Sequence, residues 1–184
     1  ATPQILGSLP YTFTGVGDSI VDVSAYSDRL LALVVGGNSA SRHFAVIPYD
    51  EDGDRLGSLV NTTDVYAGLL PLNLRGTAAF LEIKAVGEWK IVAYPLAVAP
   101  RIAKGEPYTG KGDFVLIVDD SSVRTATITG NRADRHFAVH GYDKSGSPRL
   151  LVNTTEPYVG TVLLRRDTIL LVFQAVGEWI VTLE

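Results

Sequence analysis

The sequence predicts an all-β fold made of two tandem antiparallel β-sandwiches, jelly-roll-like and related by an internal repeat. Three observations lead to this prediction. The stretch RHFAVIPYD at 42–50 returns as RHFAVHGYD at 135–143. Short runs rich in Val, Ile, Leu, Phe and Tyr alternate with period two between Gly, Asn, Asp and Pro, which is typical of strands and hairpins. No stretch shows the longer period of a convincing helix.

The repeat divides the 184 residues into two copies, each long enough for a β-sandwich with its own core. The offset between the copies is 95 residues at Gly15/Gly110 and 90 residues at Trp89/Trp179. The small deletions that cause this change belong in loops, near 28, at 54–59 and at 73–76. We therefore expect a lead-in at 1–10, a first sandwich at 11–95, a linker at 96–105 and a second sandwich at 106–184.

Alternation along each run assigns side chains to faces of the predicted sheets. In the repeated stretch it places Phe44 and Val46 toward the core, and His43 and Tyr49 on the other face. Trp89 shares a row with aliphatic residues, so we expect this Trp and its counterpart in the second copy to fill the cores. The strands expected in the first copy are 19–24, 30–35, 43–49, 59–62, 68–72, 78–85 and 89–94.

Composition excludes several classes of function. The net charge is −4 and neither copy carries a Lys/Arg stripe, so no nucleic acid is expected as a partner. No apolar run approaches the roughly 18 residues needed to cross a bilayer, so no membrane insertion is expected. Cys is absent, which excludes disulfides and thiolate metal sites. The chain lacks Met and opens Ala-Thr-Pro-Gln, which is typical of a mature product after signal cleavage or of an excised part of a longer protein. Of the two we favour secretion, which places the protein outside the cell or at its surface.

Two kinds of side chain are candidates for ligand binding. One is the outward row of the repeated stretch, which carries His and Tyr. The other is a Tyr two residues before a Gly, which either stacks on a sugar ring or ties a corner to the backbone through its hydroxyl. Histidines four residues apart on one strand lie about 13 Å apart and cannot chelate one ion unaided. The candidates are His43, Tyr49, Tyr66, His136, His140, Tyr142 and Tyr158.

An acidic cluster at Asp50, Asp52 and Asp54 is a weak candidate for a calcium site. Its spacing does not match the EF-hand loop, and the second copy keeps only the first acid, Asp143. We therefore favour a hairpin turn at this position, and we expect no metal and no cofactor.

Two further repeated motifs are interpreted as turns. Gly17-Asp18 and Gly112-Asp113 stand at the head of a strand, where Asp caps a turn by accepting hydrogen bonds from nearby backbone amides. Asn61-Thr62-Thr63 and Asn153-Thr154-Thr155 have the form of glycosylation sequons. Because they recur at the same point of both copies, an Asx turn after a strand is the favoured interpretation.

Three outward positions that are charged in the first copy are aliphatic in the second. Three changes in one direction predict that these positions are neighbours on one sheet, and that this sheet is covered in the second copy. Monomers rarely leave so large an apolar patch bare. We therefore expect the first sandwich, the linker or a second subunit to cover it. The interface candidates are therefore Ile117, Val172 and Ile180, in place of Asp22, Glu82 and Lys90.

The repeated motifs also support a resemblance to known modules. G-x-G-D before a strand, HFAV-x-x-YD-x-x-G, LVNTT-x-x-Y-x-G and a closing AVGEW resemble the tandem β-sandwich repeats of actinobacterial secreted and surface proteins. More loosely, they look like the pre-peptidase C-terminal modules of secreted bacterial hydrolases. The resemblance covers nearly the whole chain and implies a jelly-roll-like sandwich with an accessory, binding or adhesive role. It transfers no functional residues.

The function expected is that of a non-catalytic binding or accessory module of a secreted or cell-surface bacterial protein, with a carbohydrate or a protein as its ligand. An enzyme is not expected, since the sequence contains no G-x-S-x-G motif and nothing nominates a pair of catalytic carboxylates. Two alternatives remain open. One is a structural assembly protein that forms homo-oligomers through the apolar outer sheet of the second copy, and the other is a hydrolase with a site between the copies.

Overall fold

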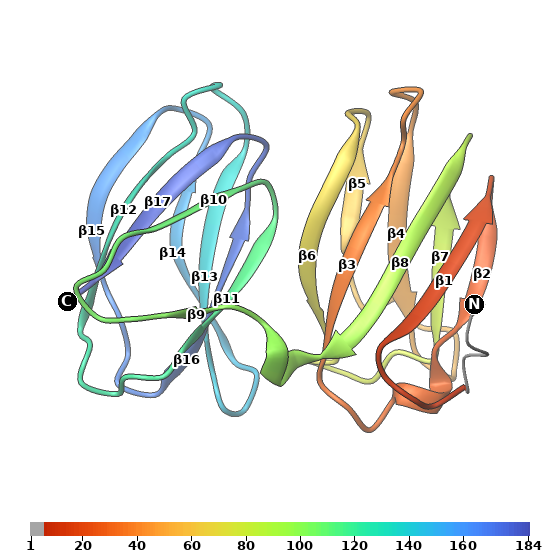
Figure 1. Ribbon diagram of the computed structural model, residues 1–184, viewed down its shortest axis with the longest axis horizontal. Helices are drawn as coiled ribbons and strands as arrows, with labels where there is room; N and C mark the ends of the chain where they lie inside the picture. The colour runs from red at the N-terminus through yellow and green to blue at the C-terminus, as the bar shows by residue number, and fades with distance from the viewer. Residues whose placement is uncertain (1–5) are drawn as a thin grey trace. The chain divides into compact units, whose positions relative to one another are not determined.

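The structure, a computed structural model, describes residues 6–184 and is built almost entirely of β-strands (Figure 1). The chain forms two compact units, Ala1–Val98 and Ala99–Glu184, and their boundary falls inside the predicted linker. None of the described helices has the length and apolar character needed to cross a membrane. The predicted all-β sandwich architecture is confirmed.

The first unit has eight strands in two antiparallel sheets, ordered β1-β8-β3-β6 and β2-β7-β4-β5. Strands that follow one another in the chain mostly alternate between the two sheets, which is the jelly-roll arrangement. All seven expected strands are present, and β1 is an eighth that the sequence pattern did not predict. The strands are β1 (Tyr11–Val16), β2 (Ser19–Asp22), β3 (Leu31–Gly37), β4 (Phe44–Tyr49), β5 (Val60–Thr62), β6 (Tyr66–Leu72), β7 (Phe80–Lys84) and β8 (Glu88–Pro95).

The second unit repeats this strand order, as β10-β17-β12-β15 and β11-β16-β13-β14, and adds β9 beside β11. The expected linker at 96–105 is therefore not all connection, because it contains β9 and a 3-10 turn at Leu96–Val98. The strands are β9 (Arg101–Ile102), β10 (Tyr108–Lys111), β11 (Phe114–Val118), β12 (Thr125–Gly130), β13 (Phe137–Asp143), β14 (Pro148–Thr154), β15 (Tyr158–Leu163), β16 (Thr168–Gln174) and β17 (Glu178–Leu183).

Each unit has its own hydrophobic core between its two sheets. Phe44 and Val46 are fully buried in the first core, whereas His43 is exposed and Tyr49 half-buried, so the predicted faces of β4 are confirmed. Trp89 and Trp179 are 5% and 1% exposed and belong to the two cores, as expected. The Trp179 ring stacks on Phe173, with 3.8 Å between ring centroids.

A set of contacts that we call the Trp clasp joins the β1–β2 turn to the β7–β8 hairpin. Trp89 Nε1 donates a hydrogen bond to the Gly17 carbonyl at 3.1 Å, and Gly17 adopts a positive φ of 73°. The Trp89 ring lies on Gly15, where a Cβ would come within 2.4 Å of it. Asp18 Oδ1 accepts the Ala85 amide at 3.0 Å. The repeated G-x-G-D and A-x-G-E-W motifs are therefore two halves of one contact.

The second unit has the same clasp. Trp179 Nε1 donates to the Gly112 carbonyl at 3.0 Å, the ring lies on Gly110, and Asp113 Oδ1 accepts the Ala175 amide at 2.9 Å. The expectation that Asp bonds amides nearby in the sequence is corrected in both copies, since the amides lie 67 and 62 residues away. A local sequence motif indicates that the Asp carboxylate accepts a hydrogen bond from a backbone amide, but it does not indicate which part of the chain supplies that amide.

Candidate binding surface

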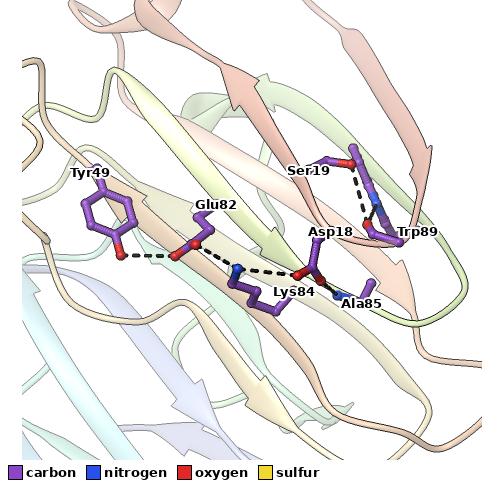
Figure 2. Close-up of polar contacts among 8 residues, drawn as sticks. Asp18, Ser19, Tyr49, Glu82, Lys84, Ala85 and Trp89 are labelled. Carbon is purple, nitrogen blue, oxygen red and sulfur yellow. Dashed lines mark hydrogen bonds and ion pairs between the residues drawn. The ribbon is translucent and has the colours of Figure 1, made fainter.

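The outer face of the β2-β7-β4-β5 sheet carries four polar side chains joined in a row, the polar array of Asp18, Lys84, Glu82 and Tyr49 (Figure 2). Tyr49 Oη donates to Glu82 Oε2 at 3.0 Å. Lys84 Nζ lies 3.0 Å from Glu82 Oε1 and 3.3 Å from Asp18 Oδ2. The row therefore crosses from β4 over β7 to the turn before β2.

Strand alternation and the Trp clasp hold the polar array in place. On β7, Leu81 and Ile83 are fully buried in the core, so Glu82 and Lys84 between and beyond them point outward. Asp18 is fixed because its other carboxylate oxygen accepts the Ala85 amide. A contact that maintains the fold thus also positions one end of the polar array.

Each member of the polar array shifts the pKa of its neighbours. The hydrogen bond from Lys84 lowers the pKa of the Glu82 carboxyl, with Tyr49 adding to the effect. The same contact raises the pKa of Lys84, and the Glu82 carboxylate raises the pKa of the Tyr49 hydroxyl. The Ala85 amide lowers the pKa of Asp18. At neutral pH the row therefore holds two carboxylates, one ammonium and one neutral phenol, which suits polar recognition.

Apolar and aromatic side chains flank the polar array. Ile20 pairs with Glu82 across β2 and β7 and is 66% exposed. Phe80 is half-buried and pairs with Tyr49 across β7 and β4. A surface that mixes exposed apolar area, aromatic rings and ordered hydrogen-bonding groups has the composition of a ligand-contacting face.

His43 precedes β4, and its ring bonds a neighbouring edge strand. His43 is exposed, and its Nε2 lies 3.1 Å from the Asn61 Oδ1 of β5. The expected Asx turn at Asn61 is corrected, because it is the Thr62 hydroxyl that accepts the Asp64 amide, at 3.0 Å. Thr154 does the same for the Glu156 amide in the second unit.

The counterpart face in the second unit is aliphatic where the first is charged. Val172 stands at the place of Glu82 and is 7% exposed. His140 pairs with Val172 and is half-buried; burial lowers its pKa, and the exposed His136 adds to the effect. The Tyr142 ring lies 6.4 Å from that of His140. The predicted His and Tyr row is therefore present on this sheet, in an apolar setting.

The expectation that the three interface positions share one sheet is wrong for Ile180. Ile117 on β11 and Val172 on β16 lie on paired strands, but Ile180 lies on β17, which belongs to the β10-β17-β12-β15 sheet. Ile180 is 40% exposed and Ile117 half-buried. The cause is the jelly-roll connection, which sends β16 and β17 to different sheets although they are consecutive. That an outer face of the second copy serves as an interface stays a prediction.

Tyr66 and Tyr158 contribute to the cores rather than to an open surface. Each ring is half-buried and packs against the core of its own unit. The ring centroids lie 6.1 Å from that of Phe44 and 6.4 Å from that of Phe137. One side of each ring is therefore occupied by protein, which disfavours the sugar-stacking alternative for both residues.

The acidic cluster forms a hairpin turn, as favoured from the sequence. Asp50 Oδ1 accepts the Asp54 amide at 2.8 Å and the Asp52 amide at 3.1 Å. In the second unit Asp143 Oδ1 accepts the Ser145 amide at 2.8 Å. Across residues 6–184, no group of three or more His, Cys, Asp or Glu side chains is arranged to hold a metal ion.

Two buried asparagines, one in each unit, were not predicted from the sequence. Asn38 and Asn131 are buried with φ of 62° and 60°. Asn38 Oδ1 accepts the Arg42 amide at 2.8 Å, and its Nδ2 donates to the Asp64 carbonyl at 2.8 Å. Asn131 makes the matching contact with the Glu156 carbonyl. The repeated G-N-x-A-x-R-H-F at 37–44 and 130–137 was the signal for this loop.

Comparisons with known proteins find only distant structural likenesses. No model of a protein family matches the chain, and no curated protein is similar to it. Among solved structures, the regulatory subunit of a cAMP-independent protein kinase A from Trypanosoma brucei is 8% identical, with a TM-score of 0.27, over 94% of this chain and 73% of that one. The Trypanosoma cruzi protein bound to guanosine is 9% identical, with a TM-score of 0.28, over 97% and 73%. Likenesses this distant carry no functional argument.

Proposed function

We propose that the chain is a non-catalytic recognition module that binds its ligand through the outer face of the β2-β7-β4-β5 sheet in the first unit. The observation that carries this proposal is the polar array beside exposed Ile20. The motifs repeated in both copies form the Trp clasps, the turns and the cores, so their repetition is explained by the fold. The polar array belongs to one unit alone, so the shared fold does not require it.

The chemistry of this face favours an uncharged polar ligand, and a neutral glycan is the ligand class we propose. Two carboxylates and one ammonium leave one net negative charge on the polar array, which disfavours anions. Sugar hydroxyls both donate and accept hydrogen bonds, so they fit alternating carboxylate and ammonium groups. The half-buried rings of Tyr49 and Phe80 offer apolar area to the faces of a sugar. Placement in a secreted or cell-surface bacterial protein rests on the resemblance of the repeats.

The second unit provides the substitutions for the test. Glu82→Val and Lys84→Gln install the residues that stand at 172 and 174. Binding of the wild-type chain and both variants would be measured on a glycan array, and affinities for each glycan found by calorimetry. We expect each substitution to weaken binding by about tenfold or more, because hydrogen bonds to charged groups contribute about 1.5–3 kcal/mol.

Lys90→Gln is the matched control, because Lys90 is an exposed Lys of the same unit on the other sheet. It should leave binding unchanged. A chain that binds no glycan, or one whose affinity survives both face substitutions, contradicts the proposal. Light scattering in the same samples addresses self-assembly: a stable oligomer without a glycan signal would favour the assembly function instead.

A further inference from the structure

Strand β15 forms one edge of its sheet in the second unit (Figure 1). Within residues 6–184 it pairs with β12 alone, so its other side is open. Its six residues, YVGTVL, include no charged residue and no Pro. Val159 is 78% exposed and Leu163 is 60% exposed, and Thr161 between them is also exposed. Exposed apolar edge strands are templates for pairing with another strand, because their backbone groups lack partners.

The hydrogen bonds on the paired side of β15 show which of its backbone groups point to the open side. Leu164, which follows the strand, donates its amide to the Arg124 carbonyl at 2.7 Å. Backbone groups of successive residues point to opposite sides of an antiparallel strand, so the even-numbered residues of β15 bond β12. The N–H and C=O groups of Val159, Thr161 and Leu163 therefore point to the open side. These same three residues carry the exposed side chains.

The counterpart edge strand of the first unit, β6, is protected at the matching place. Pro71 stands in β6 where β15 has Leu163. Leu96 donates its amide to the Leu30 carbonyl at 2.9 Å, so the even-numbered residues of β3 bond β8. Ala32 is one of them and lies opposite Pro71, so position 71 points to the open side. Pro has no N–H, and it therefore withholds a donor from that edge. Only the second unit keeps all the donors of this edge.

The open side of β15 is complementary to itself. An antiparallel pair centred on Thr161 places Val159 of one copy opposite Leu163 of the other. All three residues carry free N–H and C=O groups, so every opposed pair in this register exchanges backbone hydrogen bonds. The exposed rows also meet, which brings Val159 against Leu163 twice, and such cross-strand pairs stabilise a sheet. Thr161 Oγ1 already lies 2.9 Å from Thr127 Oγ1 on β12, and the hydroxyl row would continue into the second copy.

We propose that two copies of this chain associate edge to edge through β15, as an antiparallel pair with a twofold axis at Thr161. The two four-stranded sheets then form one sheet of eight strands. A second copy is the partner because a twofold contact needs the same surface on both sides, and β15 supplies both halves. The ladder is short, so the dimer dissociates on dilution and is not obligate. This contact is independent of the glycan-binding face, which lies on the first unit.

Sedimentation velocity of the full chain over a concentration series tests the association. Leu163→Pro installs the residue found at 71 in the first unit and removes one donor from the open side. Thr161→Lys places two like charges side by side at the twofold axis, which disfavours pairing. Thr109→Lys is the matched control, because Thr109 is an exposed Thr on β10, the opposite edge strand of the same sheet. Circular dichroism establishes that each variant is folded.

We expect the wild-type chain and Thr109→Lys to show the same monomer–dimer equilibrium. Each β15 substitution should raise the dissociation constant of the dimer by at least about tenfold. A wild-type chain that stays monomeric up to about 1 mM overturns the proposal, and so does a dimer that survives Thr161→Lys. Since Thr161 is exposed, this variant decides the matter even where Leu163→Pro fails to fold.

Cross-linking tests the register, because the chain has no cysteine of its own. Val159→Cys and Leu163→Cys chains would be mixed in equal amounts, oxidised and analysed by mass. Opposed residues of a hydrogen-bonded pair have Cα atoms about 5.5 Å apart, within the range of about 4.4–6.8 Å that a disulfide needs. Two copies of the same variant hold their cysteines about 13 Å apart in this register. We expect mixed dimers to outnumber either unmixed dimer by at least about tenfold, and a random proportion of the three overturns the proposed pairing.

Discussion

The two units share the contacts at the ends of their strands and differ on the outer face of one sheet. Both have a Trp clasp, a buried Asn loop and an Asp-capped hairpin. On the outer face, Glu82 and Lys84 of the first unit are replaced by Val172 and Gln174 in the second. Stability thus resides in turns and core, which leaves the outer face free to change without loss of the fold.

The replacements on this face are coupled for an electrostatic reason. Glu82 and Lys84 stabilise each other's charged forms. With either one replaced alone, the other would lose its nearest oppositely charged neighbour: Lys84 would keep only the Asp18 carboxylate, and Glu82 would keep only the Tyr49 hydroxyl. The second unit lacks both charges, so its face avoids that cost. The difference between the units is therefore one change of surface type rather than several independent substitutions.

The largest difference between the units is expected for loss of Trp. Trp179→Ala should destabilise the second unit by about 4 kcal/mol, and Trp89→Ala should cost the first unit less, because Trp179 also stacks on Phe173. Urea unfolding followed by circular dichroism measures the effect. The remaining Trp reports by fluorescence on the unaltered unit, because each unit has one Trp. Equal costs in both units would contradict the role assigned to the ring stack.

The buried Asn loops should respond alike in both units. Asn131→Ala loses the hydrogen bonds to Arg135 and Glu156 and leaves the positive φ without the side-chain contacts that offset its strain, so a loss of about 2 kcal/mol is expected. Asn131→Gly keeps the backbone freedom and isolates the hydrogen-bond contribution. Unfolding midpoints of these variants, and of the same changes at Asn38, check whether the loop acts equally. A loss of stability in one unit only would show that the same loop geometry does not contribute the same free energy of unfolding in both units.

A smaller effect is expected at the carboxylate of the clasp. Asp113→Ala removes the acceptor of the Ala175 amide and should cost about 1 kcal/mol. Asp113→Asn retains an acceptor oxygen and should cost less. Asp18→Ala in the first unit should in addition weaken ligand binding, because Asp18 also holds Lys84. Thermal unfolding and the glycan-binding assay separate these two consequences.

The smallest effect is a pH dependence confined to the second unit. Burial lowers the pKa of His140 in the folded chain. As pH falls, His140 is therefore protonated at a higher pH in the unfolded chain than in the folded chain. His140 therefore lowers the stability of the second unit as pH drops through about 6.5, the ordinary value. His140→Ile, which installs the residue found at Ile47 of the first unit, should remove this dependence. Unfolding midpoints at pH 8 and pH 5 measure it, and an unchanged difference between them would contradict the assignment to His140.

Much of the fold was predictable because alternation reports which face a side chain occupies. The positions of β2 to β8, the buried Phe44 and the buried Trp rings followed from it. Alternation does not report which sheet a strand joins, and this is why Ile180 was grouped with the wrong neighbours. The first strand, β1, was missed although Tyr11 to Thr14 alternate aromatic residues with Thr, a pattern that is typical of strands.

The candidate surface was predictable in part. Tyr49 and His43 were recognised from the row on β4, and Glu82 was recognised as an outward charge. Asp18 could not be joined to them, because the Asp18–Lys84 contact spans 66 residues and depends on how the β1–β2 turn meets β7. Pairings between distant turns are set by tertiary structure, and single-sequence patterns report only local geometry.

The position of the Trp clasp also determines how a unit responds to tension. In the β1–β8 ladder Tyr11 pairs with Ala93 and Val16 with Glu88, so the chain enters and leaves the unit at the same end of the ladder. A pull on both chain ends would peel these strands apart one pair at a time, starting at Tyr11. The Trp89 ring on Gly15 lies at the far end of the ladder. The first unit would therefore open from the Tyr11 end, with the clasp as the last contact of the β1–β8 ladder to break.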